Sequence, residues 1–127
     1  MEKTVIRTEA APAPFQGAPY NQAIVAGELV FVAGQLGLAP GDTAVEGDVG
    51  RQTEQALANL AAILEAAGSS MDKLVKTSVF LADLDDFQGM NEVYARHVGD
   101  TPPARSTVEI SALPSGALVE IEAVAAV

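Results

Sequence analysis

The apolar positions along the chain follow two different periods. Between Asp48 and Ala67 they recur every third or fourth residue, at Ala56, Leu57, Leu60, Ala61, Leu64 and Ala67. This spacing places them in one stripe on a helix. Asp48 suits the N-cap, and Gly68 suits the position just after the end. The sequence therefore predicts a long helix whose alanine-rich side packs closely against a sheet.

A second, shorter helix is predicted after the turn DLDDF. Its apolar side is formed by Met90, Val93 and Tyr94, followed by His97 or Val98. The aspartates of the turn supply an N-cap, and Gly99 follows the last apolar position. We expect this helix to cover roughly Phe87–Val98.

The remaining apolar segments are short and β-compatible, which predicts strands. The segment AIVAGELVFVAGQL divides at Gly27-Glu28 into two strands of a hairpin. Further strands are expected over Thr4–Thr8, Leu74–Ala82, Ala104–Ile110 and Leu118–Ala125. The predicted order is β-β-β-α-β-α-β-β, an α+β fold with a mixed sheet and both helices on one face.

Alternation along the last two strands predicts the character of the other sheet face. Arg105, Thr107 and Glu109 share one side of their strand, opposite to the side of Val108. In the last strand Glu120 and Glu122 project opposite to Val119, Ile121 and Ala123. If the branched residues meet the helices, Arg and Glu side chains lie on the face away from them. An uncovered face of this kind favours a partner subunit.

Composition sets the class of protein. The chain has 127 residues, of which 49% are hydrophobic and 19% charged, so one globular domain over residues 1–127 is expected. The absence of cysteine excludes disulfides and thiolate zinc sites. No apolar run is long enough to span a membrane, and the N-terminus lacks a signal-peptide core. A cytoplasmic location is the expectation.

The charge weighs against several functions. The formal net charge is −10, which disfavours nucleic acid but leaves room for a small anion at a local positive site. The glycine-rich segment GQLGLAPG lacks the lysine of a phosphate loop, so nucleotide binding is rejected. No ligand set with metal spacing accompanies DLDD, which is interpreted as a cap and solvated turn. His97, late in its helix, is interpreted as structural.

Three stretches together resemble the RidA/YjgF family of enamine and imine deaminases. They are PPARSTVEI followed by VEIEAVAA, VKTSVFLADLDDFQGMNEVYARHV, and APYNQAIVAGELVFVAGQLGL. The resemblance extends over roughly residues 4–125, with matching order and loop lengths. It implies a chorismate-mutase-like fold that assembles as a homotrimer, with a cleft at each subunit interface. It also implies hydrolysis of 2-imino or enamine acids to 2-keto acids and ammonia, without metal or organic cofactor.

The resemblance also assigns residues. Arg105 matches the family's substrate-carboxylate arginine, and Glu120 matches the glutamate that handles the attacking water. Tyr20 and Asn91 match positions that line the cleft, and Gly34 falls in the segment whose backbone approaches the ligand. Two positions depart from the familiar pattern. Thr107 stands where cysteine is common, and Ala33 where serine is common, which affects the substrate range more than the reaction class.

Each assignment has a simpler structural alternative. Arg105 can form an ion pair with Glu120 or Glu122, and Glu120 can be a solvated strand residue. Tyr20 can be a packing residue in its loop, and Asn91 a surface residue of its helix. Burial would raise the pKa of Glu120 and a neighbouring arginine would lower it, so its protonation state stays open.

The chemistry fits the residues nonetheless. Arginine holds a carboxylate through two parallel hydrogen bonds, and a carboxylate such as Glu120 can move protons between water and ammonia. The alternative function is a non-catalytic trimeric module that binds small carboxylates or protein partners.

Overall fold

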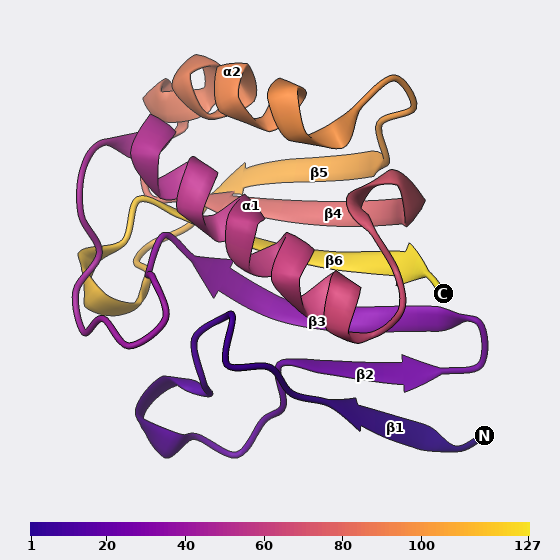
Figure 1. The fold of residues 1–127 in the computed structure, drawn as a ribbon. Coiled ribbons are helices and arrows are strands. Elements are labelled where there is room, and N and C mark those ends of the chain that lie inside the picture. Colours follow the sequence, from indigo (N-terminus) through magenta and orange to yellow (C-terminus); the bar gives the residue numbers. More distant parts are fainter.

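Residues 1–127 are described by a computed structural model that contains one six-stranded sheet (Figure 1). The strands are β1 (Lys3–Ile6), β2 (Ala23–Ala26), β3 (Leu29–Leu36), β4 (Leu74–Leu81), β5 (Ala104–Glu109) and β6 (Val119–Ala126). Their order across the sheet is β1-β2-β3-β6-β4-β5. Only β4 and β5 pair in parallel, and every other neighbouring pair is antiparallel. The predicted element order and the mixed sheet are therefore confirmed.

The two helices, α1 (Val49–Ala66) and α2 (Phe87–Val98), lie on the same side of the sheet (Figure 1). Helix α1 begins as predicted, because the Asp48 carboxylate accepts a 2.9 Å hydrogen bond from the Arg51 N–H. Helix α2 begins differently. Asp86 occupies its N-cap without a side-chain cap bond, whereas Asp83 accepts the Asp85 N–H in the preceding turn. The DLDD segment thus caps the turn before α2 and not α2 itself.

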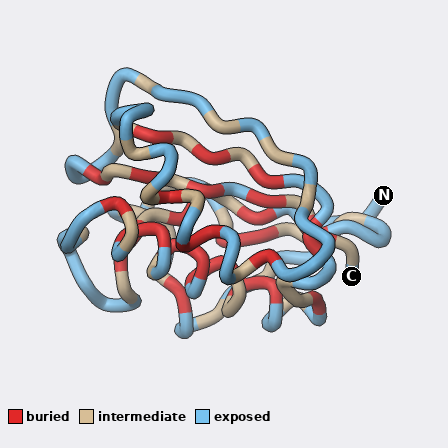
Figure 2. The backbone as a smooth tube through the Cα atoms, turned by 90° about the horizontal axis from the view of Figure 1, so that it is seen from above, coloured by how far each residue is buried: buried red, intermediate tan, exposed pale blue.

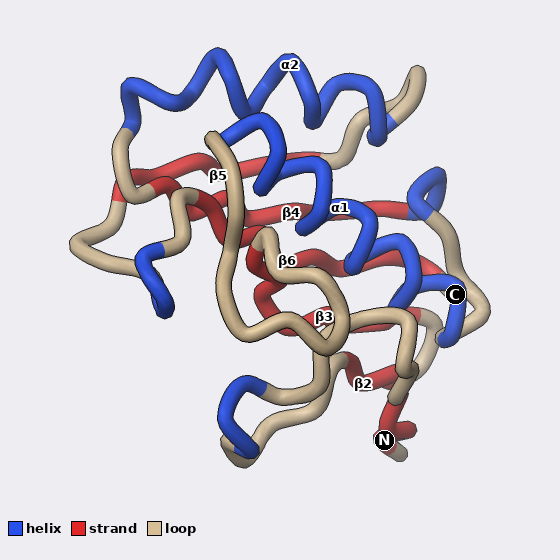
Figure 3. Tube along the Cα trace, turned by 60° about the vertical axis from the view of Figure 1, so that its left-hand side comes forward, coloured by secondary structure: helices blue, strands red, loops and turns tan.

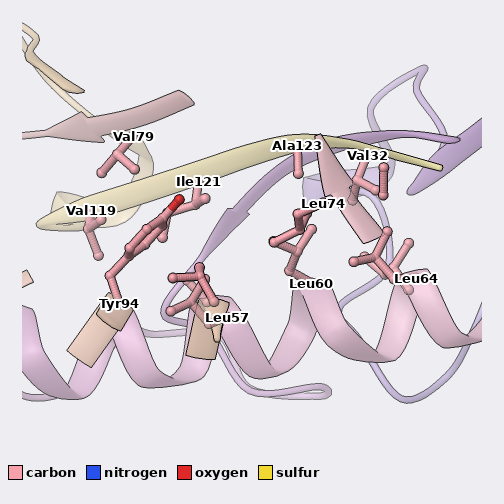
Figure 4. Packing of buried hydrophobic residues seen from close by; sticks show 14 of the residues in the cluster. Val32, Leu57, Leu60, Leu64, Leu74, Val79, Tyr94, Val119, Ile121 and Ala123 are labelled. Atoms are coloured by element: carbon pink, nitrogen blue, oxygen red, sulfur yellow. The ribbon is translucent and has the colours of Figure 1, made fainter. Parts of the chain in front are cut away.

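The core lies between the helices and the sheet. Leu57, Leu60 and Leu64 of α1 point toward the strands (Figure 4). Val79 of β4 and Ile121 of β6, both fully buried, lie on the sheet side of this core (Figure 4). Along the strands, buried positions alternate with more exposed ones (Figure 2). This is the period of two that a sheet covered on one face requires.

Strand β5 corrects the prediction about sheet faces. In its register with β4, Arg105 pairs with Thr77 and Thr107 pairs with Val79. Both of these β4 residues are buried on the helix side of the sheet. Laterally paired residues point to the same face, so Arg105 and Thr107 project toward the helices. Val108 projects to the opposite face and is 45% exposed. The alternation was predicted correctly, but the face assigned to Arg105 was wrong.

The sheet face away from the helices is uncovered and largely apolar. It exposes Phe31 at 46% as well as Val108, and Glu120 and Glu122 project from it as predicted. A hollow of about 410 Å³ on this face includes Phe31, Ser78 and Glu122 in its lining. No helix has the length and apolar character needed to cross a membrane.

Buried amide side chains fasten the loops to α1. The Asn59 side-chain N–H group donates to the carbonyl oxygens of Leu36 and Leu38, at 3.2 and 2.8 Å. The Gln52 side-chain oxygen Oε1 accepts a hydrogen bond from the Leu118 N–H at 2.9 Å. These bonds satisfy backbone groups at the end of β3 and the start of β6. The loop after β3 also approaches α1 closely, because a Cβ atom on Gly37 would lie 2.5 Å from the Gln52 Cα.

This close approach gives a stability prediction. We expect Gly37→Ala to lower the free energy of unfolding by about 1–3 kcal/mol, because the methyl group meets helix backbone that cannot move aside. Gly50→Ala is the matched control, since its Cβ would lie 3.4 Å or more from its nearest neighbours. Urea unfolding of both variants measures the difference. Equal midpoints for the two variants would contradict the close packing.

Candidate active site

Three loops meet at the end of the sheet where β3 ends and β6 begins (Figures 1 and 3). They are the loop between β1 and β2, the loop after β3 and the loop before β6. The first and the last of these loops, together with the ends of β3 and β6, surround a pocket of about 420 Å³. Its lining residues are Phe15, Ala18, Tyr20, Ala33, Gly34, Leu36, Pro114 and Glu120. Four of the residues proposed from the sequence, Tyr20, Ala33, Gly34 and Glu120, therefore lie together.

A β-bulge in β3 shapes one wall of this pocket. Val32 pairs with Ala123 and Gln35 with Ile121, so three steps along β3 match two along β6. The extra residue falls at Ala33-Gly34. Bulges bend a strand and redirect its side chains, and they are common beside active sites. Here the bulge turns the Ala33-Gly34 segment toward the pocket.

Glycine at position 34 leaves room for the Glu120 carboxyl group in its present position. A Cβ atom at Gly34 would lie 2.7 Å from Glu120 Cδ and 3.0 Å from Glu120 Oε2. No side chain fits there without moving the carboxyl group. The backbone of β3 thus forms the surface against which the Glu120 carboxyl group rests.

Tyr20 belongs to the loop that closes the pocket on the other side. Its hydroxyl oxygen accepts a 2.6 Å hydrogen bond from the Phe15 N–H, so the ring is tied to the turn that carries Phe15. The loop is anchored by Gln22, whose side-chain N–H group donates to three backbone carbonyls in residues 8–12 and whose oxygen accepts the Thr8 N–H. Tyr20 therefore lies in the pocket wall and also stabilises its own loop.

Two similar turns flank the pocket. Gln16 and Ser115 both have positive φ, at 53° and 57°, and each is followed by a glycine with positive φ. The Ala18 N–H donates a hydrogen bond to the Phe15 carbonyl oxygen at 3.0 Å and closes the first turn. The Ala117 N–H donates to the Pro114 carbonyl oxygen at 3.1 Å and closes the second. Two successive positive φ values define a type I′ turn, which is unfavourable for a non-glycine residue. Both turns place an apolar residue, Phe15 or Pro114, against the pocket.

The electrostatics of Glu120 follow from this setting. Partial burial raises the pKa of the Glu120 carboxyl group above its ordinary value, and the neighbouring Glu122 raises this pKa further. No cation of the same chain opposes the effect, because the two ion pairs are Arg51–Glu46 and His97–Glu54. Within the single chain, the effect of burial on the pKa of Glu120 therefore prevails over any lowering by an arginine.

Arg105 lies elsewhere, beneath α2. Its guanidinium carbon is 4.7 Å from the centre of the Tyr94 ring and 5.7 Å from that of the Phe87 ring. Its Nη1 is 4.0 Å from the Met90 sulfur. It takes part in neither ion pair of the chain. The alternative of a structural ion pair with Glu120 or Glu122 within one chain is therefore wrong, and the guanidinium has no carboxylate partner.

Thr107 and Asn91 belong to this second group. Thr107 lies two residues along β5 from Arg105, and its hydroxyl oxygen is buried without a hydrogen-bond partner. Asn91 is half-buried in α2, four residues after Phe87 and three before Tyr94, so it shares their side of the helix. The seven residues proposed from the sequence thus form two groups.

The two groups lie on opposite faces of the sheet. Arg105 pairs with Thr77, which faces the helices, whereas Glu120 pairs with Phe80, which faces away from them. One small molecule cannot contact Arg105 and Glu120 of the same chain, because the sheet lies between them. Either the two residues serve different purposes, or each completes a site on another copy of the chain.

Sequence patterns missed the apolar lining of the pocket. Phe15, Ala18, Leu36 and Pro114 come from three separate stretches, and none stands out by periodicity. The only local signals are the pairs Gln16-Gly17 and Ser115-Gly116, which favour tight turns. A turn signal does not indicate which residues the turn places against the pocket. No cluster of three metal-ligating side chains is present.

The comparisons with known proteins agree with the motifs. The family model described as Endoribonuclease L-PSP matches residues 8–127. Reactive Intermediate Deaminase A of Arabidopsis thaliana is 47% identical over 127 aligned positions, and the match covers 98% of this chain and 66% of that protein. The crystal structure of RidA from the Antarctic bacterium Psychrobacter sp. PAMC 21119 superposes with a TM-score of 0.93 at 40% identity, covering 98% of this chain and 99% of the other.

Another solved relative is Escherichia coli TdcF with bound serine. It has a TM-score of 0.91 and 38% identity, with 98% of each chain covered. The fold and site thus define a protein of the L-PSP class. Within that class, the chain belongs to the RidA/YjgF family, as its sequence motifs predicted.

The environment of Glu120 predicts a pH-dependent stability. Because its pKa is raised from 4.5 in the folded chain, the folded state binds more protons, and stability falls as the pH rises from about 4.5 through the raised pKa. Glu120→Gln should therefore raise Tm at pH 7, with the gain disappearing below about pH 4.5. Thermal unfolding from pH 3.5 to 8 measures this. Glu28→Gln, at the exposed hairpin turn, is the control; the same pH-dependent gain in both variants would contradict a special setting for Glu120.

Proposed function

We propose that the protein hydrolyses reactive 2-imino and enamine acids, such as 2-iminopropanoate and 2-iminobutanoate, to 2-keto acids and ammonia. The observation that carries this proposal is a single carboxyl group with a raised pKa in an otherwise largely apolar pocket. A general acid–base works best when its pKa approaches the working pH. The deaminase name of the Arabidopsis relative supports the same reaction.

The proposed reaction uses Glu120 for proton transfer. Water adds its oxygen to C2 of the N-protonated imine while Glu120 takes a proton from that water, which gives a neutral amino alcohol. Glu120 returns this proton to the nitrogen, and ammonia leaves as the C2–O double bond forms and the hydroxyl proton passes back to the Glu120 carboxylate. Glu120 then gives that proton up to the released ammonia. Holding water and imine together makes the attack nearly unimolecular. Proton transfer of this kind contributes on the order of 10²–10⁴-fold.

Arg105 is proposed to bind the substrate carboxylate. Its guanidinium has no carboxylate partner within the chain, and a bidentate pair would fix both the position and the orientation of the substrate. Thr107 and Asn91, on the same side of the sheet as Arg105, are proposed to line the substrate cleft. The serine bound to TdcF is an amino acid with such a carboxylate, which supports the same class of ligand for this chain.

Both groups meet one substrate only if they come from different copies of the chain. We therefore propose a homotrimer, in which the Glu120 pocket of one subunit faces the Arg105 group of the next. The uncovered apolar sheet face supports an assembly, because exposed Phe31 and Val108 would be buried by a neighbouring copy. The pocket walls Phe15, Leu36 and Pro114 favour a short aliphatic side chain on the substrate.

The description of the family model names a second activity, ribonuclease action. The charge of this chain disfavours it. The formal net charge of −10 repels a phosphate backbone, and the Glu120 pocket contains no Lys, Arg or His among its lining residues. The non-catalytic carboxylate-binding module remains the alternative that the activity assay must distinguish.

The activity assay generates 2-iminobutanoate in situ and follows 2-ketobutanoate release against a competing amine trap. Wild type should release the keto acid faster than the uncatalysed control. Arg105→Ala should lose most activity through a higher KM, and Glu120→Gln should lose kcat by on the order of 10²-fold or more. Arg96→Ala, an exposed arginine of α2, is the control. A wild-type rate equal to the no-enzyme rate, with keto-acid binding retained, would establish the binding module instead.

Subunit mixing tests whether the site is shared. Arg105→Ala and Glu120→Gln chains are unfolded together in equal amounts and refolded, and native mass spectrometry reports the assembly. In a cyclic trimer with shared sites, about one quarter of the interfaces regain both residues, so about one quarter of wild-type activity should return. Activity no higher than that of the separately refolded variants would contradict a shared site, and a monomeric mass would contradict the trimer.

A further inference from the structure

We propose that Tyr94, held in place by Thr77, is a positioning residue that orients the Arg105 guanidinium for carboxylate binding. This inference rests on the proposed function, since it concerns the arginine expected to hold the substrate. It adds residues to which neither the motifs nor the comparisons give a role. The contacts that carry it are the ring under Arg105 and the buried hydroxyl pair behind that ring.

The first contact is between a cation and an aromatic face. The Arg105 guanidinium carbon lies 4.7 Å from the Tyr94 ring centre, within the range of a cation–π interaction. Phe87 at 5.7 Å and the Met90 sulfur at 4.0 Å complete the surroundings of the guanidinium. All three neighbours come from α2. Helix α2 therefore contacts the guanidinium group of Arg105, at the end of a long side chain that extends from the edge strand β5.

The second contact fixes the ring itself. The Tyr94 and Thr77 hydroxyl groups are 2.6 Å apart, and both residues are buried. Thr77 is also the register partner of Arg105 in the parallel pair of β4 and β5. The residue beside Arg105 in the sheet thus fixes the ring beneath its guanidinium. Figure 4 shows the Tyr94 ring reaching from its helix toward the sheet residues Val79 and Ile121.

An aromatic partner suits a substrate-binding arginine better than a carboxylate does. A carboxylate would occupy the paired N–H donors that the substrate needs, whereas an aromatic face attracts the cation and leaves paired donors available. A free arginine side chain has many rotamers, and ordering it before binding improves affinity. The result is a guanidinium that is ordered but has no competing anion.

The variants separate the ring face from the hydroxyl group. Tyr94→Leu removes the aromatic face, and we expect KM for the imino acid to rise roughly 5- to 30-fold with kcat nearly unchanged, because about 1–2 kcal/mol of orientation is lost. Tyr94→Phe keeps the face but loses the Thr77 bond, so it should lower Tm and raise KM by less than Tyr94→Leu does. Phe87→Leu, at a position 39% exposed, tests the outer ring without disturbing the core. Val98→Ala, buried in α2 and not among the Arg105 contacts, is the control for lost stability.

Two further measurements do not depend on catalysis. The Arg105 side-chain Nε–H resonance should be shifted upfield by the ring in wild type and Tyr94→Phe, and not in Tyr94→Leu. Titration with 2-ketobutanoate should give a Kd that rises roughly 5- to 30-fold in Tyr94→Leu. If wild type is inactive but these two results hold, the proposed reaction fails and the positioning role stands.

The positioning role is overturned by any of three results. These are no ring-current shift in wild type, no keto-acid binding by wild type, and an unchanged KM and Kd in Tyr94→Leu. An equal rise of KM in Val98→Ala would also overturn it, because the effect would then follow stability alone. If Tyr94→Leu does not fold, the positioning role is tested by Phe87→Leu and by the Arg105 Nε–H resonance of wild type. An unshifted resonance then contradicts the proposal.

Discussion

The side-chain alternation of β4 is the constraint on which the rest of the structure depends. This strand lies between β5 and β6, and its positions Thr77 and Val79 are buried under the helices. Pairing transfers that orientation to both neighbours, so Arg105 faces the helices while Glu120 faces away from them. A one-residue slip in either register would reverse the result for that strand. The separation of the two groups is therefore a consequence of one buried strand, and neither side chain can change face without disrupting the core.

The same constraint explains why the two charged residues have such different surroundings. Arg105 projects beneath α2, where aromatic side chains and a methionine surround its guanidinium. Glu120 projects to the uncovered face, where it rests on Gly34 in an apolar pocket beside Glu122. Had the two shared a face, their mutual attraction would have lowered the pKa of Glu120 and used the donors of Arg105. Within one chain, the sheet prevents this pairing of Arg105 with Glu120.

Much of the fold, and less of the site, was predictable from the sequence. The apolar stripe of α1 is long and one-sided, so the helix and its Asp48 cap follow from spacing alone. Strand β5 shows where such reasoning ends. Alternation determines which residues share a face but not which face is covered, and the apolar Val108 is on the uncovered one. The β3 bulge and the turn residues Phe15 and Pro114 were missed for another reason, since their place in the pocket depends on contacts between distant segments.

The misleading pattern in β5 itself bears on the assembly. An isolated edge strand with helices over one face would place its branched residues there and polar residues outside. This strand instead has Val108 outside and Arg105 and Thr107 inside, where an arginine must be held by aromatic rings and a threonine hydroxyl finds no partner. In one chain, that arrangement leaves Val108 exposed and the Thr107 hydroxyl group unpaired. The proposed assembly would offset both costs, because the outer apolar face would be buried against another copy and the inner polar groups would meet a ligand.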